Sequence, residues 1–267
     1  MDIFFPLPAV LGSAELSASM SQAAAKEENP LVNIIINVLL PTLILSKLSK
    51  EGEAIYQLGP TLAMVVALAL PFGYGLWHWV KHKKLNIFSC VGLGAILLTG
   101  LITIFLWKSP EAKPHVALIF GIKEAIQPLI LGSLFLITAR SSNPLFRTFI
   151  YNDSIFDIQR IEKSIAEKQL ISDYEGLLWK CTLMFFGSFC VSAVLNLGLS
   201  LYFLGDLEAS NPDWRTVYNE QVGRITFWGF LVNGAPLMIV DFYILYTMVH
   251  GLEKLTGLDK QTLMVPR

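Results

Sequence analysis

Long apolar stretches without formal charge recur along the chain and predict membrane-spanning helices. Residues 87–107 read IFSCVGLGAILLTGLITIFLW. A hydrocarbon core about 30 Å thick needs about 20 helical residues to cross it, so this stretch is long enough to span a bilayer. The same pattern predicts six spans in all, at about residues 31–47, 60–80, 87–107, 115–139, 180–204 and 225–250.

The composition favours a membrane protein over a soluble one. Hydrophobic residues make up 54% of the chain and charged residues 15%, with a mean hydropathy of +0.55. A soluble domain carries about a quarter charged residues. The net charge of −1 and the pI near 6.4 give no electrostatic reason to expect a nucleic-acid partner. We therefore predict an all-α, polytopic membrane helix bundle whose surroundings are lipids.

The pattern divides the chain into three parts. Residues 1–30 have mixed composition and are expected to form a mobile N-terminal tail, residues 31–258 the six-helix transmembrane domain, and residues 259–267 a C-terminal tail. Basic residues in short loops stay cytoplasmic, and with both termini inside, 13 lysines and arginines lie inside against 6 outside. This asymmetry predicts cytoplasmic N- and C-termini.

The loop between the fourth and fifth spans contains one more predicted helix. Residues 152–171 have helical spacing, with Ile158, Ile161 and Ile165 on one stripe, and Asn152 or Asp153 is the expected N-cap. We expect this amphipathic helix to fold back on the cytoplasmic face of the bundle. The alternative is a docking surface for a cytoplasmic partner.

Two charged residues, Lys123 and Glu124, lie inside the fourth span, with Gln127 one turn further on. A charge at the centre of a bilayer costs on the order of 3 kcal/mol, so such residues face the bundle interior or a wet cavity. Adjacent helical residues point about 100° apart, so we expect Lys123 to pair with Asp241 of the sixth span and Glu124 with Arg224. Two interpretations stay open: a structural charge pair that fixes helix register, or a solute or proton site.

A second polar line follows the fifth span. Ser188, Ser192, Asn196 and Ser200 are spaced by four and share one helix face. Small, weakly polar residues let helices approach closely, which favours a packing seam over a solute path. The Asn196 amide must find a partner in lipid.

Metal-binding residue types gather near the predicted cytoplasmic ends of the spans. His78, His82, Cys90 and Cys181 have side chains that suit zinc or copper. The chain lacks compact ligand spacings such as Cys-x-x-Cys, and His82 lies among lysines that repel a cation. A Gly-rich phosphate loop and a His-Glu-x-x-His motif are also lacking. We therefore expect no metal, no cofactor and no enzymatic activity.

Short features along the chain give a family resemblance. They are Leu40-Pro41, the run GLITIF at 100–105, the run NPLFR at 143–147, Trp179, Asn196, Tyr202 and Trp214. On these features, residues 37–258 resemble the intracellular septation protein A family and its larger six-pass relatives, which are often labelled as major-facilitator-like transporters. The resemblance implies a bacterial inner-membrane protein connected with cell-envelope synthesis and division.

Two functional hypotheses follow. The first is a non-enzymatic scaffold or accessory factor that works through contacts with envelope or division proteins, as the resemblance implies. The alternative is a small transporter or channel, as a homodimer, with a polar site at Lys123, Glu124 and Asp241. This alternative predicts a water-accessible cavity at mid-depth that touches both Lys123 and Asp241.

Overall fold

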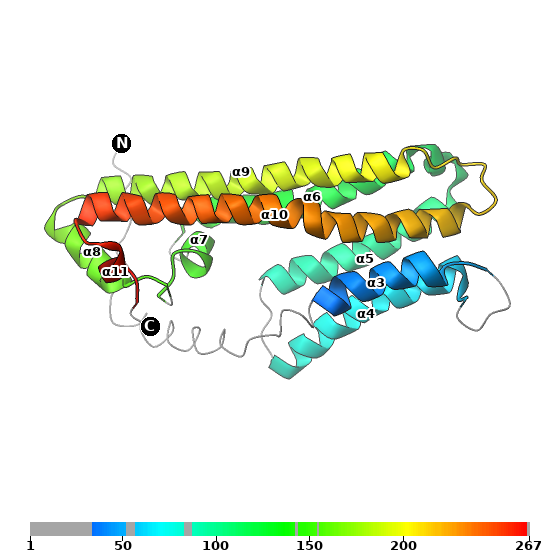
Figure 1. Cartoon of the computed structure of the whole chain (residues 1–267), viewed down its shortest axis with the longest axis horizontal. Helices are drawn as coiled ribbons and strands as arrows, with labels where there is room; N and C mark the ends of the chain where they lie inside the picture. The colour runs from blue at the N-terminus through cyan, green and yellow to red at the C-terminus, as the bar shows by residue number, and fades with distance from the viewer. Residues whose placement is uncertain (1–33, 52–56, 83–86, 142–143, 154, 266–267) are drawn as a thin grey trace. The chain divides into compact units, whose positions relative to one another are not determined.

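The computed structural model describes residues 34–51, 57–82, 87–141, 144–153 and 155–265, and the regular elements in these ranges are helices (Figure 1). One isolated bridge pairs Phe156 with Met264. The predicted all-α class is confirmed.

In the part of the chain that the structure describes, four helices are long and apolar enough to cross a bilayer: Gly59–Lys81, Pro110–Thr138, Ile171–Leu204 and Trp214–Thr256. Within the described ranges, two further apolar helices, Ile35–Leu48 and Gly94–Lys108, are shorter. The helices are thus compatible with a polytopic membrane protein, and the full count of six spans stays a prediction.

The chain divides into two compact units. Of the described residues, unit 1 takes 132–190 and 237–265, and unit 2 takes 34–131 and 191–236. The division passes through three helices: α6 (Val116–Thr138), α9 (Ile171–Leu204) and α10 (Trp214–Thr256). Each of these helices therefore contributes one segment to each unit.

Unit 2 begins with a continuous apolar helical stretch in which π-helical turns flank Pro41 at the start of a short α-helix. Proline lacks an N–H and so interrupts the regular bonding pattern. Gly59, with φ of 71°, begins the next helix. The elements are η1 (Ile35–Leu39), α3 (Leu40–Leu43), η2 (Ile44–Leu48), α4 (Gly59–His82), α5 (Ile87–Lys108) and η3 (Pro110–His115), followed by the segments of α6, α9 and α10.

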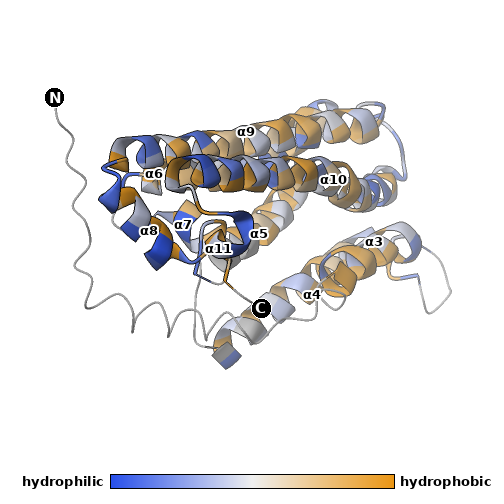
Figure 2. Cartoon of the chain, turned by 60° about the vertical axis from the view of Figure 1, so that its left-hand side comes forward, coloured by the Kyte–Doolittle hydropathy of each residue, from blue (hydrophilic) through white to orange (hydrophobic). Residues whose placement is uncertain are grey.

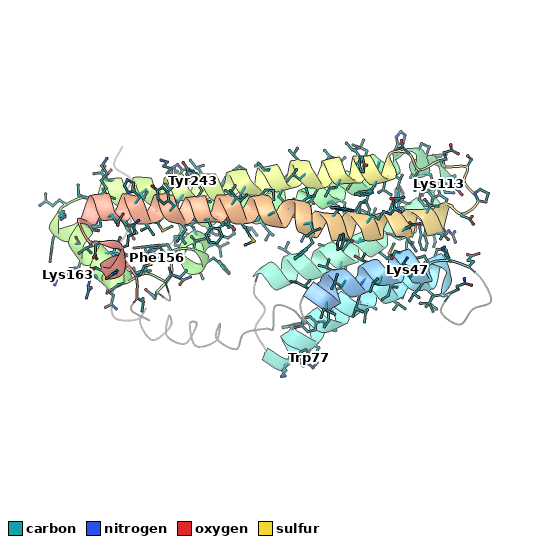
Figure 3. The ribbon with its side chains drawn as sticks, viewed as in Figure 1. Lys47, Trp77, Lys113, Phe156, Lys163 and Tyr243 are labelled. Carbon is teal, nitrogen blue, oxygen red and sulfur yellow. The ribbon has the colours of Figure 1, made fainter. Side chains whose placement is uncertain are left out.

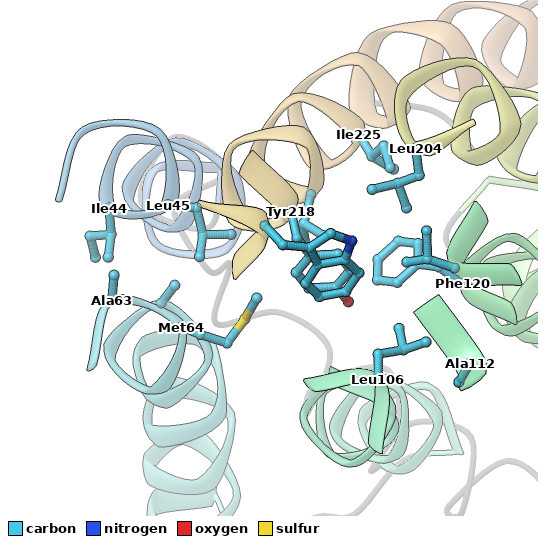
Figure 4. Close-up of a cluster of buried hydrophobic side chains, with 14 residues drawn as sticks. Ile44, Leu45, Ala63, Met64, Leu106, Ala112, Phe120, Leu204, Tyr218 and Ile225 are labelled. Carbon is cyan, nitrogen blue, oxygen red and sulfur yellow. The ribbon is translucent and has the colours of Figure 1, made fainter. Parts of the chain in front are cut away.

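Buried aromatic rings form the centre of the unit 2 core (Figure 4). The Trp214 and Tyr218 rings stack with centroids 5.2 Å apart, and the Phe120 ring meets Tyr218 edge-on at 6.1 Å. The Tyr218 hydroxyl forms a hydrogen bond of 3.0 Å with Thr103 of α5. The first turns of α10 are thereby fixed against α5 and α6.

Asn219, the next residue of α10, is fully buried and bonds to residues at the end of η2 and the start of α4. Its Nδ2 donates to Ser49 Oγ at 3.1 Å and to the Pro60 carbonyl at 2.7 Å. Because a buried amide is costly without partners, these bonds hold Ser49, just after η2, and the first turn of α4 to α10.

Unit 1 contains α7 (Leu145–Phe149), α8 (Ile158–Glu167) and α11 (Lys260–Leu263), with its segments of α6, α9 and α10. In α8, Ile161 and Ile165 are buried on one stripe. Ser164 and Lys168 both donate to the Thr256 carbonyl, at 3.3 and 2.5 Å, which fastens α8 to the end of α10.

The expected N-cap of this helix was wrong. Asp157, rather than Asn152 or Asp153, accepts a hydrogen bond from the Arg160 N–H at 3.2 Å, so α8 begins later than position 152. The physical reason is tertiary: Phe156 is fully buried and its bridge to Met264 holds the chain extended just before the helix.

Large apolar side chains are exposed along the long helices. Figure 2 colours the same helices by hydropathy, with hydrophobic residues in orange. In unit 1, Ile239, Phe242 and Tyr243 of α10 are each at least 60% exposed, and Figure 3 labels Tyr243 on this helix. In unit 2, Leu101 of α5 is 65% exposed. Extended apolar surface of this kind is typical of contact with lipid or a partner.

Candidate functional site

Lys123 of α6 is buried in unit 2, with 4% of its side chain exposed. Its ammonium forms an ion pair with the Glu124 carboxylate and donates a hydrogen bond to Thr99 Oγ1 of α5 at 2.7 Å. The same nitrogen lies 4.5 Å from the centre of the Phe120 ring. The buried charge therefore has an anion, a hydroxyl and an aromatic face as partners, which offsets the cost of its desolvation.

The ion pair between adjacent residues corrects the expected pairing. Cβ directions differ by about 100°, but the flexible four-carbon stem of lysine lets the ammonium turn back to its neighbour. Arg224 pairs instead with Glu220, one turn away, at 2.7 Å. Asp241 belongs to unit 1, and its Oδ1 has no hydrogen-bond partner among the described residues.

Amide groups extend the polar contacts from α6 to α9 and α10. Asn196 Nδ2 donates to the Glu124 carbonyl at 3.4 Å, and Asn196 Oδ1 accepts from Asn233 Nδ2 at 2.7 Å. Ser192 donates in turn to Asn233 Oδ1 at 2.9 Å. With the α5 contact, these bonds link four helix segments; we call Thr99, Lys123, Glu124, Ser192, Asn196 and Asn233 the polar network.

The serine line of α9 lies at close helix contacts. Ser192 and Ser200 are buried, and Ser200 donates to the Asn196 carbonyl at 2.9 Å. A Cβ at Gly121 of α6 would lie 2.7 Å from Leu197 Cδ1 and 3.1 Å from Ser200 Cβ. Because the missing side chain lets α6 and α9 approach, this geometry supports the packing-seam interpretation.

Two other residues that the sequence singles out, Ser188 and Gln127, lie outside the polar network. Ser188, in the unit 1 part of α9, is buried and donates to the Phe185 carbonyl of its own helix at 2.7 Å. Gln127 is half-buried, one turn beyond Lys123. Glu124 keeps 23% of its side chain exposed, more than its lysine partner.

Sequence reasoning missed Thr99 and Asn233. Asn233 had a usable signal, because an amide within the apolar run 225–250 needs a partner as much as Asn196 does. Thr99 had none, since a threonine hydroxyl satisfies itself on its own helix; here Thr99 Oγ1 also donates to the Ala95 carbonyl at 2.8 Å.

A second polar cluster, in unit 1, was also missed. Arg147 forms an ion pair with Glu162 of α8, and its guanidinium lies 5.9 Å from the centre of the Tyr151 ring. Tyr151 is fully buried, with the Tyr174 ring 6.1 Å away. Burial raises the pKa of the Tyr151 phenol; Tyr174 and Glu162 act in the same direction, and Arg147 opposes them.

Of the four metal-type residues, the structure describes the side chain of Cys181. The side chains of His78, His82 and Cys90 lie outside the described residues. Cys181 is buried in α9. Among the side chains that are described, no group of three or more His, Cys, Asp or Glu residues is placed to hold a metal ion.

Comparison with known proteins yields no relative: no protein-family model matches the chain, and no curated protein or solved structure is significantly similar to it.

Proposed function

We propose that the protein is a non-enzymatic membrane scaffold whose intramembrane charges hold its helices together. One observation carries this proposal: the Lys123 ammonium is almost fully buried and engaged by Glu124, Thr99 and the Phe120 ring. A charge that serves a solute needs an approach path and an unoccupied face. Among the described residues, the Lys123 side chain is 4% exposed and its ammonium has partners on three sides, which are the contacts of a structural element.

The arrangement also suits the energetics of a structural charge. Inserting a charged residue at mid-membrane costs on the order of 3 kcal/mol, and retaining a buried pair is favourable only when further hydrogen bonds complete it. The polar network supplies such bonds from α5, α9 and α10. Its consequence is a defined register among four helix segments.

The proposed cellular role follows the resemblance to septation protein A. In this role the protein is an accessory factor in the inner membrane of bacteria, with both termini cytoplasmic, and contacts proteins of envelope synthesis or division. Its outward apolar faces, exemplified by Phe242 and Tyr243, are available to lipids and partner helices.

The test replaces both charges of the pair. Lys123→Met with Glu124→Leu substitutes apolar side chains of similar size, and Lys163→Met with Glu167→Leu removes an exposed ion pair of α8 as the matched control. We expect the first double variant to fold and to leave solute permeability of liposomes unchanged from wild type. The measurements are melting in detergent and influx of protons and small cations.

A folded Lys123→Met/Glu124→Leu variant that loses a flux seen with wild type, while the α8 control keeps it, contradicts the scaffold proposal. That outcome supports the second candidate function, a small transporter or channel. One observation favours this candidate: Glu124 is partly exposed while its backbone carbonyl belongs to a network of hydroxyls and amides.

A further inference from the structure

Unit 2 has a cavity of about 660 Å³ where α9 ends and α10 begins. Apolar side chains in its lining include Leu201, Leu207 and Val217, and charged ones are Asp206, Glu208 and Arg224. They come from the last turn of α9, the connecting loop and the first three turns of α10. The cavity thus combines an apolar wall with both signs of charge.

The polar network gives the depth of this cavity along the helices. Asn233 meets Asn196, and Arg224 precedes Asn233 by nine residues, or about 14 Å of helix. Leu204, the last residue of α9, follows Asn196 by eight residues, or about 12 Å. Half of a hydrocarbon core is about 15 Å. If the network lies at mid-membrane, the cavity lies at the level of the lipid headgroups.

Aromatic residues at the same end of unit 2 agree with a membrane boundary. Trp107 lies at the end of α5, and Tyr202 lies in the last turn of α9. Tryptophan and tyrosine gather at membrane interfaces. Tyr202, which also lines the cavity, is 77% exposed, so this wall of the cavity reaches the helix surface.

The charges in the cavity select among headgroups. The Nη2 of Arg224 donates a hydrogen bond to Glu220 Oε1. The remaining N–H donors of the guanidinium suit the two oxygens of a phosphate. The Asp206 and Glu208 carboxylates accept hydrogen bonds from a primary ammonium. A trimethylammonium has no N–H to donate, and an anionic headgroup is repelled by two carboxylates.

We propose that this cavity binds the headgroup of an ethanolamine phospholipid, with the phosphate on Arg224 and the ammonium on Asp206 and Glu208. The proposal rests on α9 and α10 crossing a membrane and is independent of the scaffold role. It assigns Tyr202 and Leu201 to the upper part of the acyl chains.

The test offers the full-length protein, in detergent micelles, equal amounts of phosphatidylethanolamine, phosphatidylcholine and phosphatidylglycerol, and counts retained lipids by native mass spectrometry. We expect wild type to retain the ethanolamine lipid about tenfold over the choline lipid, as two charge-assisted hydrogen bonds allow. Asp206→Asn with Glu208→Gln should abolish this preference. Arg224→Gln should lower retention of both lipids, and Arg224→Lys should restore part of it.

Matched controls lie close by. Asp213→Asn removes an exposed acid of the same loop, and Lys50→Gln removes an exposed cation of unit 2; neither residue lines the cavity. Both should behave as wild type, and circular dichroism checks that each variant is folded. Equal retention of ethanolamine and choline lipids by wild type overturns the proposal. So does an unchanged preference in Asp206→Asn/Glu208→Gln, or equal competition by free glycerophosphoethanolamine, which marks a site for a soluble zwitterion.

Discussion

Asn233 of α10 donates a hydrogen bond of 2.7 Å to Asn196 of α9, and this bond joins two helices that each carry one amide at this level. Ser192 of α9 completes the arrangement by donating to Asn233 Oδ1. An amide surrounded by lipid has no water with which to form hydrogen bonds, so each asparagine needs the partner that the other helix supplies.

Replacing the two asparagines should show that they act together. We expect Asn196→Ala and Asn233→Ala each to lower the free energy of unfolding, with a coupling of about 0.5–1.5 kcal/mol in a double-mutant cycle, as for interhelical hydrogen bonds in membranes. Unfolding in mixed micelles measures it. Ser188→Ala is the control, since its hydroxyl bonds its own helix. Strict additivity of the two asparagine changes would contradict the contact.

The close approach of α6 and α9 predicts a contrast between two glycines. Gly121→Val should destabilise the protein by about 1–3 kcal/mol, because its side chain would crowd Leu197 and Ser200. Gly198→Val, on α9, has open space within 4 Å of its Cβ and should have little effect. Melting temperatures in detergent compare the two, and equal losses would argue against the packing seam.

Removing the carboxylate that pairs with Lys123 should lower the free energy of unfolding more than removing the threonine hydroxyl that Lys123 also contacts. Glu124→Gln leaves Lys123 with an uncompensated charge, and we expect a loss of about 3–5 kcal/mol. Thr99→Val removes a single hydrogen bond to Lys123 and should cost about 1–3 kcal/mol. Thr226→Val serves as reference, because the Thr226 hydroxyl bonds the Val222 carbonyl of its own helix. The reverse order in equilibrium unfolding would be inconsistent with the pair.

Tyr151 should make unit 1 sensitive to alkaline pH. Burial raises the pKa of its phenol, so the folded state keeps the proton while the unfolded chain releases it near pH 10. The contribution of the protonated Tyr151 to the free energy of unfolding is fully present below pH 10. It is lost as pH rises, by about 1.4 kcal/mol at pH 11. Tyr151→Phe cannot ionise, so its unfolding free energy should fall less between pH 9 and 11 than that of wild type. Parallel pH profiles would rule out this role.

The sequence predicts the helices and the positions of costly polar groups, but not the partners of those groups. The uncharged run 87–107 and the stripe with Ile161 and Ile165 indicated helices because apolar periodicity is a local property of the chain. The cost of Lys123, Glu124 and Asn196 was also readable, since a charge or amide in an apolar run needs a partner whatever the fold. The identity of the partners could not be predicted from the sequence. Lys123 pairs with Glu124 rather than with Asp241, and Arg224 pairs with Glu220 rather than with Glu124.

The sequence by itself determined an all-helical, lipid-compatible chain and the positions where polar groups demand satisfaction. Only the tertiary structure decided that Thr99 meets Lys123, that Asn233 meets Asn196, and that Asp157 caps α8. The physical reason is that helix formation and burial follow from spacing along one segment. Hydrogen-bond partners depend instead on the rotation and depth of neighbouring helices, which are fixed when small residues such as Gly121 let them pack.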